Sequence, residues 1–162
     1  MAEPRDDQVG WEELTRSECF GFLASKQVGR IAVVDDVGPL VVPVNYVLDR
    51  YTVVFRTDEG TKLDAAGRHS AVAFEIDEID ARTRTGWSVL LRGEATEVSD
   101  LSELERLRDL SLEPWVPGAK ARYARILPAV VSGRRISAPG RSAGGRPSPP
   151  HDDLPPYNRD QT

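Results

Sequence analysis

The chain has 162 residues, a formal net charge of −5 and 40% hydrophobic residues, which suits one soluble domain with a core. The acidic balance argues against nucleic acid as the main partner, because phosphate backbones bind basic surfaces. The single cysteine excludes an intramolecular disulfide, and two histidines far apart make no convincing zinc site. The sequence shows no signal peptide and no apolar run of membrane-spanning length, so we expect a cytoplasmic protein without membrane contact.

The N-terminal part is expected to begin with an arm and continue as a short helix. Residues 1–10 are polar and acidic, and we expect them to be flexible. Thr15 and Glu18 have the spacing of a capping box, which predicts a helix from there to about Ser25. Cys19 lies on this helix, where we expect a small buried hydrophobe rather than a nucleophile.

Short segments rich in β-forming residues follow along the chain. The expected strands are residues 28–34, 40–48, 51–57, 71–77, 86–98 and 123–136. Asp49-Arg50 reads as a hairpin connection, and 78–85 as an irregular polar stretch. Pro43 predicts an edge, a bulge or a place where something other than a strand pairs with its strand. Gly93 predicts a bulge in the fifth strand.

Several strands are apolar on both faces. In the second strand Val42 and Val44 point one way, whereas Val41 and Val47 point the other way. We therefore expect a barrel whose outside also packs on helices or on a second subunit. Ser99 or Asp100 can cap a further helix, whose apolar stripe is expected to face the core and consists of Leu101, Leu104, Leu107 and Leu110.

The composition changes at Ser137. Six of the twelve prolines lie between Pro139 and Pro156, among glycines and serines. Such a segment has little to bury, so we expect residues 137–162 to form a disordered or extended tail. The folded domain is then expected to span residues 11–136.

The stretch Phe55–Lys62 carries the strongest chemical signal. Arg56 and Thr57 end a strand, and Thr61 and Lys62 lie at the start of an expected helix. A helix N-terminus has unpaired N–H groups and the positive end of the dipole. Two cations and two hydroxyls there predict a site for a phosphate monoester. A capped helix with two solvated cations is the alternative, because the motif is looser than a P-loop.

Five segments in this order resemble the FMN-binding split-barrel proteins related to pyridoxamine 5′-phosphate oxidase. They are Gly29–Val33, Pro43–Tyr46, Phe55–Leu63, Gly86–Val89 with Gly93 downstream, and Gly133–Ile136. The resemblance covers about residues 11–136. It implies a mainly β (α+β) fold, a six-stranded split β-barrel with short flanking helices, in a homodimer that holds FMN in a cleft between its subunits.

The resemblance also implies cofactor-binding residues. The phosphate and ribityl chain would be held by Arg56, Thr57, Thr61 and Lys62. The edge of the isoalloxazine ring would lie along Pro43, Val44 and Asn45. Trp87 and Ser88 match a position where the family contacts the cofactor, although Trp87 also suits a core aromatic.

As a function, the resemblance implies an FMN-dependent oxidoreductase acting on a small molecule that the sequence does not name. The segment Val41–Tyr46 lacks the basic residues of the true oxidases, which argues against pyridoxamine phosphate as the substrate. A deazaflavin-dependent reductase of the same fold and a non-catalytic flavin or heme binder are the alternatives. Among the charges near the expected site, Arg82 and Arg84 could attract a deazaflavin's anionic tail. The acidic residues that would repel it, and so favour FMN, are Asp58, Glu59 and Asp64.

Overall fold

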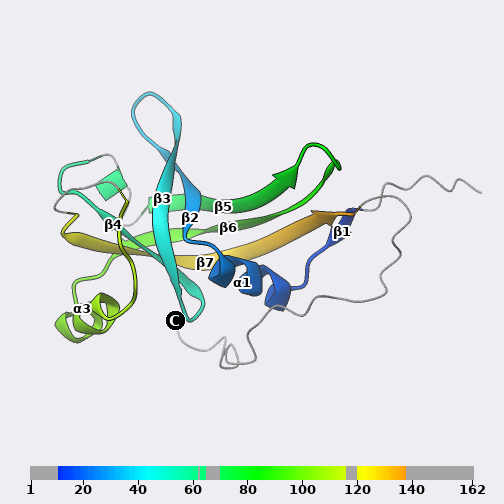
Figure 1. Cartoon of the computed structure of the whole chain (residues 1–162). Helices are drawn as coiled ribbons and strands as arrows, with labels where there is room; N and C mark the ends of the chain where they lie inside the picture. The colour runs from blue at the N-terminus through cyan, green and yellow to red at the C-terminus, as the bar shows by residue number, and fades with distance from the viewer. Residues whose placement is uncertain (1–10, 62, 65–69, 116–119, 138–162) are drawn as a thin grey trace, which may run out of the picture.

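A computed structural model describes residues 11–61, 63–64, 70–115 and 120–137 of the chain (Figure 1). The expected N-terminal arm, Lys62 and the expected tail from residue 138 on lie outside these residues. The elements are β1 (Trp11–Glu13), α1 (Arg16–Ser25), β2 (Val28–Val34), β3 (Pro39–Asp49), β4 (Thr52–Thr57), β5 (Ser70–Asp80), β6 (Thr85–Glu97), α3 (Leu101–Arg108) and β7 (Arg122–Ile136).

The strands form one antiparallel sheet that closes on itself. Their order is β1-β7-β4-β3-β2-β5-β6, and β6 pairs with β7 as well. Six strands, β2 to β7, therefore make a closed barrel, as expected from the sequence. The short β1 is an addition that the sequence did not reveal: it pairs with the C-terminal end of β7, where Trp11 lies opposite Ile136.

The two edges of β3 are paired to different extents. On one side β3 pairs with β2 from Pro39 to Asn45, and on the other it pairs with β4 only from Tyr46 to Asp49. In the described part of the chain, residues 39–45 thus have a strand on one side only. Pro43 lies in this stretch, as its missing N–H predicts.

The β5–β6 hairpin differs from expectation at its tip. Residues 78–80, expected to be irregular, continue β5, and Asp80 lies opposite Thr85. The polar side chains there are compatible with a strand because this end of the hairpin projects from the barrel into solvent (Figure 1). The expected bulge is confirmed, since the register of β6 on β7 shifts between Arg92 and Gly93. A Cβ atom at Gly93 would lie 1.9 Å from the carbonyl oxygen of Leu127.

Helix α1 packs against the barrel interior through its apolar side. The capping box is present: Glu18 N–H donates to Thr15 Oγ1, and Thr15 N–H donates to Glu18 Oε2. Cys19 is fully buried in the core, and burial, with a smaller contribution from Glu18, raises the pKa of its thiol to about 11. The thiol is therefore protonated at neutral pH, which agrees with a buried hydrophobe.

Helix α3 lies on the outside of the barrel with Asp100 as its N-cap. Leu107 is buried there with Val54, but Leu101 is 77% exposed, so the expectation that all four leucines face the core is wrong. Leu101 and Leu107 are two steps of three residues apart on the helix, so their side chains point in directions that differ by about 120°. Neither described helix is long and apolar enough to cross a bilayer.

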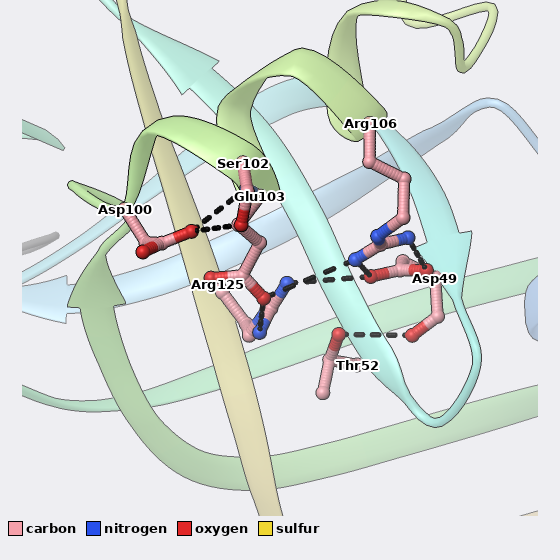
Figure 2. A network of polar contacts seen from close by, with 7 residues as sticks. All are labelled: Asp49, Thr52, Asp100, Ser102, Glu103, Arg106 and Arg125. Atoms are coloured by element: carbon pink, nitrogen blue, oxygen red, sulfur yellow. Dashed lines mark hydrogen bonds and ion pairs between the residues drawn. The ribbon is translucent and has the colours of Figure 1, made fainter.

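An ionic network fastens α3 to the barrel (Figure 2). Arg106 donates two parallel hydrogen bonds of 2.8 Å to the carboxylate of Asp49, at the end of β3. Arg125, on β7, donates to Asp49 at 3.3 Å and lies 2.6 Å from Glu103 of α3. Asp49 is only 8% exposed, and the hydrogen bonds from Arg106 lower the pKa of its carboxyl group. One carboxylate thus joins α3, β3 and β7.

Replacing Asp49 by Asn tests this joint. We expect Asp49→Asn to lower the free energy of unfolding at pH 7 by about 2 kcal/mol, because it removes the charge that two arginines bind. A carboxyl group whose pKa is lowered in the folded protein stabilises the fold at pH values above its pKa in the unfolded chain, which is about 4. This stability is lost as the pH falls through the lower pKa of the folded protein. Urea unfolding should therefore show a difference between the two proteins at pH 7 that shrinks towards pH 3. A difference independent of pH would contradict the ionic account.

Candidate functional site

A cavity of about 310 Å³ opens beside the unpaired stretch of β3, and we call it the β3-edge cavity. Its walls come from β2, β3, β4, the loop after β4 and the connection between α3 and β7. Of the residues expected to bind a cofactor, it brings together Pro43, Val44, Asn45, Arg56, Thr57 and Thr61. Lys62, the seventh residue that was expected to contact the phosphate or the ring, lies outside the described residues.

Trp87 and Ser88 line a different cavity. This second cavity has about 460 Å³ and lies where β1, the β5–β6 hairpin and the end of β7 meet. Trp87 stacks on Phe22 of α1, with ring centroids 4.1 Å apart. Arg84 also lines this second cavity, whereas Arg82 lines neither of the two. Within one chain, the expected cofactor residues therefore fall into two groups.

One wall of the β3-edge cavity is apolar and the opposite end is polar. The apolar wall is made by alternate residues of β2 and β3, namely Val33, Leu40, Val42 and Val44. Between them, the β3 backbone has hydrogen-bonding groups directed away from β2, where β4 does not reach. Such a wall suits a flat ring that has heteroatoms along one edge.

Arg56 forms the polar end of the cavity, and its side chain is oriented by two contacts. Its Nε donates to the carbonyl oxygen of Lys120 at 2.9 Å, and its guanidinium lies 5.1 Å from the ring centroid of Tyr123. Its terminal nitrogens make no hydrogen bond to any other residue that the structure describes. The guanidinium is thus held in place while its outer donors are available to an anion.

Lys120 is a functional candidate that the sequence analysis missed. It lines the cavity, and its N–H donates to Asp58 Oδ1 at 2.6 Å while its Nζ lies 4.0 Å from Asp58 Oδ2. Its φ of 27° is unusual for a residue other than glycine. The sequence offered one signal for this residue: Lys120 comes just before the last strand. That strand pairs with β4, where Tyr123 lies opposite Arg56.

Asp64 organises the loop between β4 and the following helical turn. This carboxylate is buried, with 3% exposure, and accepts hydrogen bonds from Thr57 Oγ1 at 3.3 Å and Gly60 N–H at 3.0 Å. Thr61 Oγ1 donates to the carbonyl oxygen of Asp58 and accepts from Asp64 N–H. Both threonine hydroxyl protons are thus used within the loop, so direct phosphate binding by Thr57 and Thr61 stays a prediction.

The acidic residues of this loop are paired with cations. Arg122 donates to Glu59 and to Glu97, which raises the pKa of its guanidinium, and its Nε lies 3.6 Å from Asp64. Asp58 is engaged with Lys120. The repulsion of an anionic ligand that the sequence led us to expect from these carboxylates is therefore reduced. Within the described ranges, no three His, Cys, Asp or Glu side chains are grouped as a metal site would require.

Asp64→Asn should loosen the loop. An amide keeps one acceptor oxygen but turns an NH2 group towards Thr57 or Gly60, so we expect a loss of about 1–3 kcal/mol in the free energy of unfolding. Urea denaturation measures the loss, and faster hydrogen exchange at the Gly60 amide would assign it to the loop. Glu59→Gln is the matched control: Glu59 is exposed, and its ion pair should contribute less than about 1 kcal/mol. Equal stability of the two variants would contradict this role for Asp64.

The chain is similar to known proteins in sequence and in fold. The uncharacterized protein Rv0080 of Mycobacterium tuberculosis is 41% identical over 135 residues, which are 80% of this chain and 88% of that protein. The structure of a FAD-binding protein from Mycobacterium smegmatis is similar, with a TM-score of 0.66, 37% identity, and coverage of 76% of this chain and 96% of that chain.

A FAD-binding protein from Mesorhizobium loti has a TM-score of 0.65 and 28% identity, over 78% of this chain and 99% of that one. The family model for pyridoxamine 5′-phosphate oxidase matches residues 15–135, and flavin-binding proteins are thus among the structures that this chain resembles. The chain belongs to the pyridoxamine 5′-phosphate oxidase family of split barrels.

Proposed function

We propose that the β3-edge cavity binds the flavin mononucleotide unit, with the ring along β3 and the phosphate at Arg56. The observation that supports this most directly is the unpaired stretch of β3, which ends at an oriented guanidinium. The residues present fit the group: an apolar wall suits the ring, backbone groups suit its heteroatoms, and Arg56 with Lys120 suits a phosphate dianion. Thr57, Thr61 and Lys62 are proposed as further phosphate and ribityl contacts.

We further propose that the protein is an oxidoreductase acting on a small molecule. A bound flavin supplies hydride or electron transfer, and the protein has to bind it, orient it and limit the access of water. Here Pro43, Val44 and Asn45 would set the plane of the ring, and the apolar wall would exclude water from one face. The absorbance spectrum of the purified protein, with mass analysis of what it releases, identifies the cofactor. Turnover with a reductant separates an enzyme from a flavin or heme carrier.

A homodimer is proposed because the outer face of the barrel carries exposed apolar side chains. The pairing of strands sets Val41, Ala32 and Ala73 side by side across β3, β2 and β5. Val41 is 58% exposed and Val34, on the same face of β2, is 76% exposed. A second copy covering this face would bury them. It could also bring its Trp87 and Ser88 to the β3-edge cavity, which would reunite the two groups of expected cofactor residues.

The dimer predicts a molar mass of twice 17.9 kDa in solution. Val41→Glu would place a charge in the buried interface and should shift the protein towards the monomer, as measured by light scattering after gel filtration. Leu101→Glu is the control, because Leu101 is exposed on α3 and should leave the mass unchanged. A wild-type monomer at micromolar concentration would contradict the proposal.

The phosphate contact predicts that Arg56→Ala weakens FMN binding by about ten- to a hundredfold, since a hydrogen bond to a charged group contributes roughly 1.5–3 kcal/mol. Lys62→Ala is expected to act in the same direction. Riboflavin, which lacks the phosphate, should bind poorly to the wild type, as measured by calorimetry. Arg108→Ala controls for lost charge, because this arginine is exposed at the end of α3. Equal affinities for riboflavin and FMN would refute the phosphate site.

Two other cofactors are candidates for the same cavity. FAD is favoured by the two FAD-binding proteins that this chain resembles, and it contains the same flavin mononucleotide unit. A deazaflavin would need further cations for its anionic tail, and among the expected ones Arg84 lines the second cavity instead. Titration of each cofactor into protein freed of bound flavin distinguishes the three.

A further inference from the structure

The second cavity lies on a face of the sheet that presents apolar side chains to solvent. Four strands run side by side there, and their pairing sets four residues in one row, which we call the apolar row. In order across the strands they are Ile79, Gly86, Ile136 and Trp11. Residues directly opposite each other in an antiparallel sheet point to the same face. Ile79 is 71% exposed and Trp11 is 57% exposed, and both line the cavity. An uncovered apolar surface of this kind is typical of a binding site.

Two arginines line the second cavity and have available donors. Arg134 is on β7, and its guanidinium lies 5.2 Å from the ring centroid of Trp11. Arg84 is at the tip of the β5–β6 hairpin. Neither side chain makes a hydrogen bond or an ion pair with another residue that the structure describes. By contrast Arg135, which points to the opposite face of β7, donates to Glu12 at 2.9 Å. The cavity therefore has positive charge beside its apolar row.

Neither the turn nor the core accounts for an arginine at position 84. Arg84 has a φ of 56°, a left-handed conformation that glycine adopts at lower cost, and its side chain is exposed. Asp80, a carboxylate that lines the same cavity, serves the turn instead. Its Oδ1 accepts hydrogen bonds from the N–H groups of Thr83 and Arg82, which lower the pKa of this carboxyl group. The cavity thus has two positive charges against one negative charge that the turn already uses.

We infer that the second cavity binds a planar apolar molecule that carries an anionic group, such as an aromatic carboxylate. The apolar row would contact its ring, and Arg134 and Arg84 would bind its carboxylate, since a guanidinium matches two carboxylate oxygens. The cavity volume of about 460 Å³ is in the range of small-molecule sites. In the proposed dimer, Trp87 and Ser88 would meet the β3-edge cavity of the second copy, so this ligand would be the substrate of the flavin bound there. This last step rests on the proposed function.

The test measures by calorimetry the binding of 2-naphthoate and of two molecules with the same ring, neutral 2-naphthylmethanol and cationic 2-naphthylmethylammonium. The wild type should bind naphthoate at least about tenfold more tightly than the alcohol, and the ammonium most weakly, because a hydrogen bond to a charged group adds to burial of the ring. Arg134→Gln and Arg84→Gln should each weaken naphthoate by about tenfold, while binding of the alcohol stays unchanged. Arg82→Gln is the matched control and should change nothing, because Arg82 is in the same hairpin turn but does not line the cavity.

Arg84 is exposed at the hairpin tip, so its substitution is not expected to destabilise the fold, and the test does not depend on Arg134→Gln alone. Equal affinities for the three molecules, or equal effects of the three substitutions, would overturn the anion site.

The substrate role has a readout of its own. In protein with flavin bound, 2-naphthoate should shift the absorbance bands of the flavin, because a substrate lies against the ring. Naphthoate that binds and leaves the flavin spectrum unchanged would overturn the substrate role alone. If the protein binds naphthoate but no flavin, the proposed function fails and the anion site is supported.

Discussion

The mismatch in length between β3 and β4 is the constraint on which the site depends. β4 ends at Thr57, whereas β3 extends beyond the end of β4 as far as Pro39, so among the described residues no strand pairs with this part of one β3 edge. A closed barrel otherwise satisfies its backbone groups by strand pairing, and here the pairing stops next to an apolar wall. The proline within this stretch is compatible with it because an unpaired edge needs no donor at that position. The cavity is therefore a consequence of how the barrel closes.

Two carboxylates hold the segments that surround the cavity. Asp64 gathers the loop after β4, and Asp58 holds the backbone of Lys120 at the end of the α3–β7 connection. Each accepts hydrogen bonds from backbone or hydroxyl donors that would otherwise be available to an anion. The loop therefore keeps its shape through its own acidic residues, and Arg56 and Lys120 provide the positive charge. This division would make the acidic segment compatible with the proposed phosphate site.

The distant network around Asp49 contributes to the same geometry. Arg106 and Arg125 bind this buried carboxylate and so fix α3 against β3 and β7 (Figure 2). The connection that carries Trp115 and Lys120 leaves from the end of α3, which means that the position of the helix limits where those residues can lie. An apolar cluster that includes Leu107 packs the helix against the barrel. Packing, the ionic network and the site are thus linked along one segment of the chain.

The sequence by itself determined the six barrel strands, the capping box of α1, the bulge at Gly93 and the family, because each depends on local patterns of apolar, turn or capping residues. It also indicated Arg56 and the proline of β3. The pairing of β1, the exposure of Leu101, and the contacts of Asp64, Trp115 and Lys120 were decided only by the tertiary structure. These features depend on contacts between residues far apart in the chain, such as Asn45 with Trp115 and Arg56 with Lys120. Local patterns carry no information on such contacts, since the closure of the barrel and the packing of α3 on it bring those residues together.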